Sequence, residues 1–208
     1  NIILKKIENN GYGNAINYAR KFVNTKYFFI FNPDIENIVE KDIEVFLKVA
    51  QKLKDKFACI GPRYSNISEK ALKQSDKNFE ISKIKSISGA AMFFNAKVFD
   101  QLKGFDENFF LYFEEIDLIL NCKKNSLKVF YLRDLSIVHE RASSIDKNLS
   151  EIDNLRSWHY MWSMFYFYKK NYSFLFGLRK TYMFIIKDLI MILCYLIILD
   201  KKKLNKRF

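Results

Sequence analysis

The clearest chemical pattern in the sequence is a group of carboxylates that follows an aromatic run. Glu114, Glu115 and Asp117 come directly after residues 109–113, which are all aromatic or apolar, and they open a predicted helix. The positive end of a helix dipole favours negative charge, so we expect these carboxylates to stay ionised, as a general base or a hydroxyl-binding group requires. Glu114 and Asp117 share one helix face, whereas Glu115 points elsewhere and is able to face a cleft. The alternative is a solvated acidic first turn, which is common in helices.

A second candidate site follows the continuous apolar run Tyr27–Phe31, which is typical of a strand buried on both faces. The run stops at Asn32, Pro33 and Asp34. Ligands of open α/β sheets bind beyond the carboxyl ends of strands, and hard divalent cations such as Mg²⁺ and Mn²⁺ prefer oxygen ligands. The carboxylate of Asp34 is therefore a candidate metal ligand. The alternative is that Pro33 and Asp34 only turn the chain and cap the next helix.

Two weaker signals lie in other predicted strands. His139 is one of two histidines and ends a strand-like segment, but a lone histidine is more often structural than a ligand. His159 lies among aromatic residues, and we interpret it as a packing or interfacial residue. Gly89 and Ala90 belong to a run of small residues, which allows either the close approach of a ligand or tight core packing.

The elements that must position these residues alternate between strands and helices up to about residue 140. Apolar runs predict strands at residues 2–4, 27–31, 57–61, 86–94, 129–132 and 136–139. Helical spacing predicts a helix after the glycine-rich turn at residues 9–14, and others at residues 43–53, 96–102 and 114–124. The polar residues 64–85 are interpreted as a surface insertion or loop. This alternation implies an α/β sheet that is mainly parallel and flanked by helices.

The C-terminal part of the chain has a different character. Residues 149–170 follow a helical pattern rich in aromatics, and residues 183–199 are apolar except for Lys187 and Asp188. The apolar run is slightly shorter than the ~20 residues that a membrane span needs. Aromatic residues, an apolar run and then a basic tail at residues 201–207 are typical of membrane-interface anchoring. A spanning helix, a helix in the membrane plane and a helix docked on protein all remain open.

Composition limits the function classes. The 208 residues suffice for one domain and a small appendage, which we expect over residues 1–145 and 146–208. The net charge of +12 suits an anionic membrane, a phosphorylated small molecule or nucleic acid. The lysines are dispersed and no nucleic-acid-binding motif occurs, so we expect no nucleic-acid partner. Cys59, Cys122 and Cys194 are far apart and lack metal-site spacing, which argues against a disulfide framework and for a reducing compartment.

Four segments carry a further signal when they are taken together and in order, namely "NNGYGNAIN", "FIFNPD", "SGAAMFFNAKVFDQLKGFDENFFLYFEEIDL" and "IVHE". They closely resemble the family 2 glycosyltransferases, nearest to the rhamnosyltransferase-like enzymes of bacterial surface-polysaccharide synthesis. The similarity runs from about residue 7 to residue 144 and implies a GT-A fold, which is Rossmann-like.

The same resemblance implies a metal-dependent transfer that inverts the anomeric configuration of the sugar. The implied donor is a dTDP- or UDP-sugar, with rhamnose as one candidate, and the implied acceptor is a glycan or a lipid-linked glycan. The implied location is the cytoplasmic face of the inner membrane, where the chain is either peripheral or held by one C-terminal span.

The resemblance also implies roles for individual residues. Asp34 matches the last carboxylate of the DxD-type motif, which binds Mn²⁺ or Mg²⁺ on the donor diphosphate, and His139 matches a histidine that completes the metal site. Glu115 matches the catalytic base, which takes a proton from the acceptor hydroxyl as that oxygen attacks the anomeric carbon. Glu114 is the alternative base, because a longer glutamate stands where the family usually has aspartate. Asp117 matches a carboxylate that supports the loop or contacts the acceptor.

Donor-binding roles are implied for residues of three segments, namely Asn9, Gly11, Asn14, Asn32, Asp34, Gly89 and Ala90. In the family, a first strand and the next acidic residue hold the nucleoside, and both are expected to precede Asn1. We therefore expect a catalytic domain that is incomplete at its N-terminus. The alternative function is a non-catalytic remnant that acts as a membrane-associated interaction module.

Overall fold

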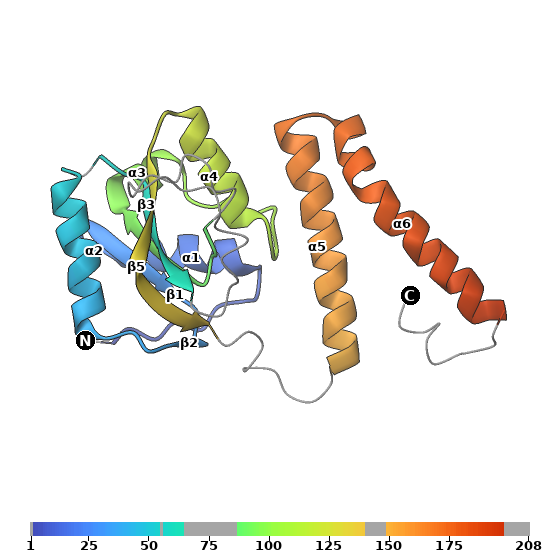
Figure 1. Ribbon diagram of the computed structural model, residues 1–208, viewed down its shortest axis with the longest axis horizontal. Coiled ribbons are helices and arrows are strands. Elements are labelled where there is room, and N and C mark those ends of the chain that lie inside the picture. Colours follow the sequence, from blue (N-terminus) through green and yellow to red (C-terminus); the bar gives the residue numbers. More distant parts are fainter. Residues whose placement is uncertain (1, 55, 65–86, 140–148, 198–208) are drawn as a thin grey trace. The chain divides into compact units, whose positions relative to one another are not determined.

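The computed structural model describes residues 2–54, 56–64, 87–139 and 149–197 (Figure 1). The chain divides into two compact units. The first unit comprises Asn1–Asn9, Gly13–Asp106 and Glu114–Ser144. The second unit comprises Asn10–Tyr12, Glu107–Phe113 and Ile145–Phe208, so it takes in two short segments in addition to the C-terminal residues.

The first unit is built on one five-stranded sheet with the strand order β1-β4-β3-β5-β2. The bounds of the strands are β1 Tyr27–Phe31, β2 Ile35–Glu36, β3 Cys59–Tyr64, β4 Ala91–Asn95 and β5 Val129–His139. Only the pair β3 and β5 is parallel, whereas the three other neighbouring pairs are antiparallel. The prediction of a mainly parallel sheet is therefore wrong for the described residues. A strand buried on both faces carries the same apolar pattern in either direction, so the pattern could not predict its direction.

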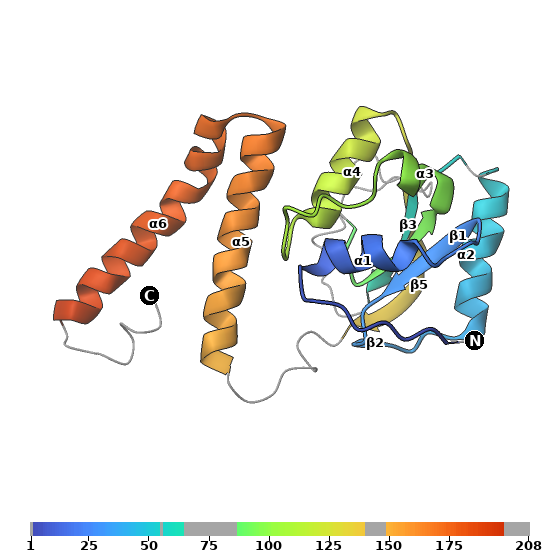
Figure 2. The same cartoon turned by 180° about the vertical axis from the view of Figure 1, so that it is seen from behind.

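Helices cover both faces of this sheet (Figures 1 and 2). They are α1 (Tyr12–Arg20), α2 (Glu40–Lys52), α3 (Ala96–Gln101) and α4 (Glu114–Lys124), in good agreement with the predicted helices. Phe93 and Phe94 of β4 point to opposite faces because side chains alternate along a strand. Phe93 packs against Phe46 of α2, with ring centroids 5.5 Å apart, and Phe94 packs against Phe99 of α3 at 5.0 Å.

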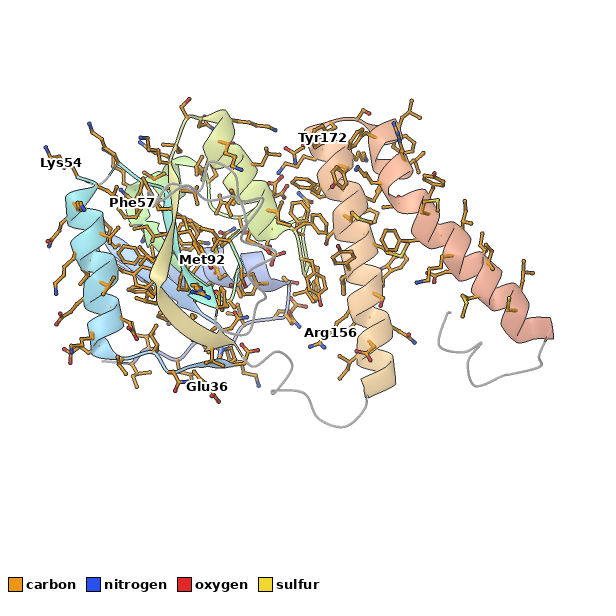
Figure 3. All side chains as sticks on the ribbon, in the orientation of Figure 1. Glu36, Lys54, Phe57, Met92, Arg156 and Tyr172 are labelled. Atoms are coloured by element: carbon orange, nitrogen blue, oxygen red, sulfur yellow. The ribbon has the colours of Figure 1, made fainter. Side chains whose placement is uncertain are left out.

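The core of the first unit lies between these layers. Phe57 and Met92 are buried inside it, with 2% and 1% of their surface exposed, whereas Glu36 and Lys54 lie at its surface (Figure 3). All three cysteines are free thiols, and burial raises the pKa of Cys59 and Cys122. These two buried thiols therefore belong to the core.

Some predicted segments differ from the structure. Residues 2–4 form no strand, and Ile2 is 98% exposed, because an apolar run without a paired neighbour does not become a strand. The strands predicted at 129–132 and 136–139 are the two halves of β5, whose pairing with β3 shifts register between Pro62 and Arg63. The strand predicted at 86–94 begins later, at Ala91. The predicted polar insertion lies outside the described residues from residue 65 onward.

The second unit contains a helical hairpin of α5 (Leu149–Asn171) and α6 (Phe174–Ile197). The predicted helix at 149–170 is confirmed, whereas the second helix begins well before the predicted residue 183. The turn between the helices is closed by the N–H of Tyr172, which donates to the carbonyl of Tyr168 at 3.0 Å. Among the described residues, no helix combines the length and the apolar character that crossing a membrane requires.

Candidate active site

The pairing of β1 with β4 brings two of the predicted donor-binding segments together. Phe31 at the end of β1 pairs with Ala91 at the start of β4. One residue further, the N–H of Asn32 donates to the carbonyl of Ala90 at 2.8 Å. Ala90 is only 3% exposed, so its small side chain lies in the core while its carbonyl holds Asn32. Asn32 and the segment of Gly89 and Ala90 are therefore neighbours, where β1 ends and β4 begins.

The pairing of β2 with β5 brings the two predicted metal ligands close along the backbone. Asp34 directly precedes Ile35, and Ile35 pairs with His139. One carboxylate oxygen of Asp34, Oδ1, is shielded from solvent. The side chain of His139 lies outside the described part of the structure. The backbones of Asp34 and His139 therefore lie close together where β2 pairs with β5.

The described side chains at this place supply one candidate ligand for a hard divalent cation, the carboxylate of Asp34. Among the side chains that the structure describes, no group of three His, Cys, Asp or Glu residues is positioned to hold a metal ion. Mg²⁺ and related cations commonly take one or two carboxylates and complete their shell with phosphate oxygens and water. A single shielded carboxylate at Asp34 agrees with that kind of site.

The alternative role of Asp34, as the cap of the next helix, is not supported. α2 begins at Glu40, and the N–H of Val39 donates to the carboxylate of Asp42 at 2.9 Å. Asp42 therefore closes this helix end, and Asp34 lies in the turn before β2. The N–H of Ile35 donates to the carbonyl of Asn32 at 3.2 Å and tightens that turn.

The predicted acidic cluster opens α4, and its first two carboxylates are withdrawn from water. Glu114 is 5% exposed and Glu115 is half-buried, and the Oε2 atom of each accepts no hydrogen bond from the described residues. Burial, followed by the charge of Glu115, raises the pKa of Glu114 to about 8, and burial also raises the pKa of Glu115. The prediction that these carboxylates stay ionised is therefore wrong for Glu114, because desolvation outweighs the helix dipole.

This environment suits proton transfer near neutral pH. A carboxyl group whose pKa is close to the working pH can both take up and release a proton. Two adjacent carboxyl groups with low solvation resist holding two negative charges, so the Glu114–Glu115 pair titrates as one coupled unit. Asp117 is 6% exposed and shares the buried face with Glu114, as the spacing predicted. The cluster is therefore a candidate acid–base site, not a solvated first turn.

The backbone that leads into α4 has an unusual conformation. Tyr112 and Phe113 both have φ of 70°, in the left-handed region that residues other than glycine rarely adopt. Strain of this kind persists where surrounding contacts hold it, and it is concentrated at functional sites. Here Phe113 packs on Phe167, with ring centroids 5.5 Å apart, and the hydroxyl of Ser163 donates to the carbonyl of Leu111 at 2.7 Å. These contacts, which the sequence analysis did not predict, hold the segment directly before Glu114.

The two glycines of the turn at residues 9–14 are required by packing. Gly11 has φ of 100°, and a Cβ atom there would lie 2.5 Å from the carbonyl oxygen of Phe110. A Cβ atom on Gly13 would lie 2.9 Å from the Cβ of Phe105. The two glycines thus let this turn approach Phe110 and Phe105 closely. The donor-binding role of Asn9, Gly11 and Asn14 stays a prediction.

Asn17 is a structural residue that the sequence analysis missed. Its side-chain amide donates to the carbonyl of Phe105 at 2.9 Å, and its Oδ1 accepts from the N–H of Phe105 at 3.0 Å. A polar residue between the apolar positions of a helix was the available signal. The interpretation of His159 as a packing residue is confirmed, because its ring stacks on Phe110 with centroids 4.3 Å apart.

We expect stability to fall as pH rises, because of Glu114. The pKa of Glu114 is about 8 in the folded protein against an ordinary 4.5, so the folded state binds more protons between these values. The contribution of Glu114 to the free energy of unfolding should therefore be largest below about pH 4.5 and should decline through about pH 8, at up to about 1.4 kcal/mol per pH unit. Urea unfolding across this range measures the slope. The variant Glu114→Gln should flatten it, whereas Glu8→Gln, at an exposed position, should not; equal slopes in all three proteins would contradict the burial of Glu114.

Comparison with solved structures finds a similar fold in a mannosyltransferase, PcManGT from Pyrobaculum calidifontis, in complex with GDP-Man and Mn²⁺. The TM-score is 0.53 and the sequence identity is 10%, over 74% of this chain and 42% of that chain. At this identity the likeness establishes the fold alone, and this chain spans less than half of the other. No protein-family model matches the sequence. A search of curated proteins finds no relative.

Proposed function

We propose that this protein is a metal-dependent glycosyltransferase that moves a sugar from a nucleotide-diphosphate donor to a glycan acceptor. One observation carries the proposal: two antiparallel strand pairs bring Asn32 beside Ala90 and Ile35 beside His139. The turn from Asn32 to Ile35 connects these two pairs, so three motif segments that are far apart in the sequence meet where β1 ends and β2 begins. The fold likeness to a mannosyltransferase that was solved with GDP-Man and Mn²⁺ supports this choice over other α/β enzymes.

The proposed reaction is a single displacement at the anomeric carbon. Glu115 takes the proton of the acceptor hydroxyl, the hydroxyl oxygen bonds to the anomeric carbon, and the bond from that carbon to the diphosphate oxygen breaks. The configuration of the sugar is thereby inverted. The raised pKa of Glu115 supports this role, because a stronger base accepts the proton more readily. The charge of Glu115 in turn helps to raise the pKa of Glu114, next to it.

Asp34 and His139 are proposed to hold a divalent cation. A bound Mn²⁺ or Mg²⁺ supplies positive charge that stabilises the departing nucleotide diphosphate. Asn32, Gly89 and Ala90 would then line the donor beside the cation, and Asp117 would brace the loop or contact the acceptor. The shielded Oδ1 of Asp34 supports this arrangement.

The finer parts of the proposal rest on the resemblance of the motifs to family 2 glycosyltransferases of the rhamnosyltransferase-like branch. They are a dTDP- or UDP-sugar as donor, rhamnose as a candidate sugar, and a lipid-linked glycan of surface-polysaccharide synthesis as acceptor. Such an acceptor would place the protein at the cytoplasmic face of the membrane. The net positive charge of the chain supports binding of an anionic donor and of an anionic membrane surface.

Titration calorimetry with UDP, dTDP and GDP, each with and without Mn²⁺, tests the proposal. We expect one of the three nucleotides to bind only when Mn²⁺ is present, because a cation held by Asp34 would neutralise the charge of the diphosphate. That nucleotide then selects the sugar donors for a transfer assay. If the chain is folded by circular dichroism and binds none of the nucleotides, the proposal fails. The non-catalytic interaction module then becomes the better description.

A further inference from the structure

The second half of α6 is exposed and apolar on every side. The helix begins in contact with α5: a Cβ atom on Gly177 would lie 3.1 Å from the carbonyl oxygen of Phe165, and Thr181 is 3% exposed. Toward its C-terminal end, α6 diverges from α5 (Figures 1 and 2). The large apolar side chains that follow are each 43–59% exposed, namely Tyr182, Met183, Phe184, Ile185, Ile186, Leu189, Ile190 and Leu193.

Apart from Lys187 and Asp188, this apolar half of α6, residues 182–193, carries only apolar and aromatic side chains. Four consecutive apolar residues, Met183 to Ile186, cover more than a full turn of helix. A helix that is apolar all round is normally buried, and contiguous exposed apolar surface marks a binding site. Burial of such side chains is favourable, so covering this surface releases substantial free energy.

The length of this segment favours the surface of a bilayer over a passage through it. From Tyr182 to Leu193 the segment is roughly 18 Å long, against roughly 30 Å for a hydrocarbon core. Lys187 and Asp188 lie in the middle of the segment, where a spanning helix would have to hold them at the bilayer centre. A helix in the membrane plane keeps the ammonium group of Lys187 at the level of the headgroups.

The charges around the segment favour anionic lipid. Arg179 and Lys180 lie on the same helix just before it. The sequence that follows, outside the described residues, contains Lys201, Lys202, Lys203, Lys206 and Arg207. Each basic residue near an anionic surface strengthens binding to it. A second copy of this chain would instead bring two basic segments of the same sign together, which costs free energy.

Exposed aromatic residues on the same unit fit the headgroup region. Trp158 and Trp162 of α5 are 66% and 47% exposed, and Tyr172 in the turn is 58% exposed. Tryptophan and tyrosine are enriched at membrane interfaces because they combine an apolar ring with a polar group. These residues provide further contacts for the hairpin at a lipid surface.

We propose that the apolar half of α6 inserts into the boundary between headgroups and acyl chains of an anionic bilayer, parallel to the membrane plane. The neighbouring lysines and arginines bind the lipid phosphates. This inference deepens, and rests on, the membrane location in the proposed function, but it involves no step of sugar transfer.

Sedimentation of the full chain with lipid vesicles tests the inference. We expect binding to vesicles that contain phosphatidylglycerol, weaker binding to pure phosphatidylcholine, and a loss of affinity as salt rises. The double variant Ile185→Glu and Leu189→Glu should bind at least about tenfold more weakly, because two apolar side chains no longer insert. The matched control Val45→Glu, at a 38% exposed position on α2, should bind like the unchanged protein.

Two outcomes would overturn the inference. One is a folded chain that does not bind anionic vesicles, or whose binding the double variant leaves unchanged. The other is a dimer in sedimentation velocity that the double variant dissociates, since a second copy would then cover the segment. Calorimetry with nucleotide and Mn²⁺ on the same preparations separates the two proposals, because vesicle binding can fail while nucleotide binding persists.

Discussion

Replacing Glu115 by glutamine is expected to lower kcat for sugar transfer by about 10²–10⁴-fold, the usual contribution of a general base. Glutamine has nearly the same shape as glutamate but cannot accept the proton of the acceptor hydroxyl. The affinity for nucleotide and metal should stay within about twofold, since this role concerns the acceptor. Initial rates of nucleotide release from the donor that the calorimetry selects, in the presence of a glycan acceptor, measure kcat.

The matched control is Glu114→Gln, one residue earlier on the same helix. Burial and the charge of Glu115 raise the pKa of Glu114 to about 8, so much of this group carries its proton at neutral pH and is a poor base there. We therefore expect Glu114→Gln to retain most of kcat and to leave the acidic limb of the pH–rate profile unchanged, because a Glu114 that carries its proton there adds no charge beside Glu115. If Glu114→Gln abolished transfer and Glu115→Gln did not, the two roles would have to be exchanged.

Replacing Asp34 by asparagine is expected to remove most of the Mn²⁺-dependent nucleotide affinity. Changes to groups that only support a metal ligand cost about 10–100-fold in metal affinity, so loss of the ligand itself should cost at least about 100-fold. Transfer should fall by a similar factor, because the diphosphate would leave without a neutralising cation. Calorimetry with nucleotide at a series of Mn²⁺ concentrations measures the loss.

Glu36→Gln is the control for this prediction. Glu36 is an exposed carboxylate on β2, two residues after Asp34, and its removal changes the net charge by the same amount. It should leave the Mn²⁺ dependence unchanged. Equal effects of both variants would indicate a general charge effect on an anionic ligand, and a wild-type response of Asp34→Asn would exclude Asp34 as a metal ligand.

Local patterns were sufficient to predict the elements that carry the site. α4 spans Glu114–Lys124 and β1 spans Tyr27–Phe31, both with the predicted bounds. These elements have local signals, namely an acidic first turn, a basic last turn and a continuous apolar run. Each signal lies within one segment of the sequence, so it can be recognised before the fold is known. The prediction failed at residues 2–4, where the apolar run has no paired neighbour, and for the direction of the strands.

To predict which candidate site residues lie close together required the resemblance of the motifs to a known family and then the register of the strands. Nothing in the spacing of Asn32, Ala90 and His139 indicates that β1 pairs with β4 and β2 with β5. The left-handed backbone at Tyr112 and Phe113 also has no local signal, because it is held by Phe167 and Ser163 from a distant helix.

The sequence by itself therefore determined which residues carry carboxylates, the bounds of β1 and α4, and that an aromatic and basic C-terminal part follows an α/β domain. Only the tertiary structure decided that β4 runs antiparallel to its neighbours, that Glu114 is buried with a raised pKa, and that α6 leaves α5 with its apolar side chains exposed. The reason is physical. Helix ends and apolar runs depend on neighbours in the chain, whereas solvation and strand pairing depend on the packing of residues that are far apart in sequence.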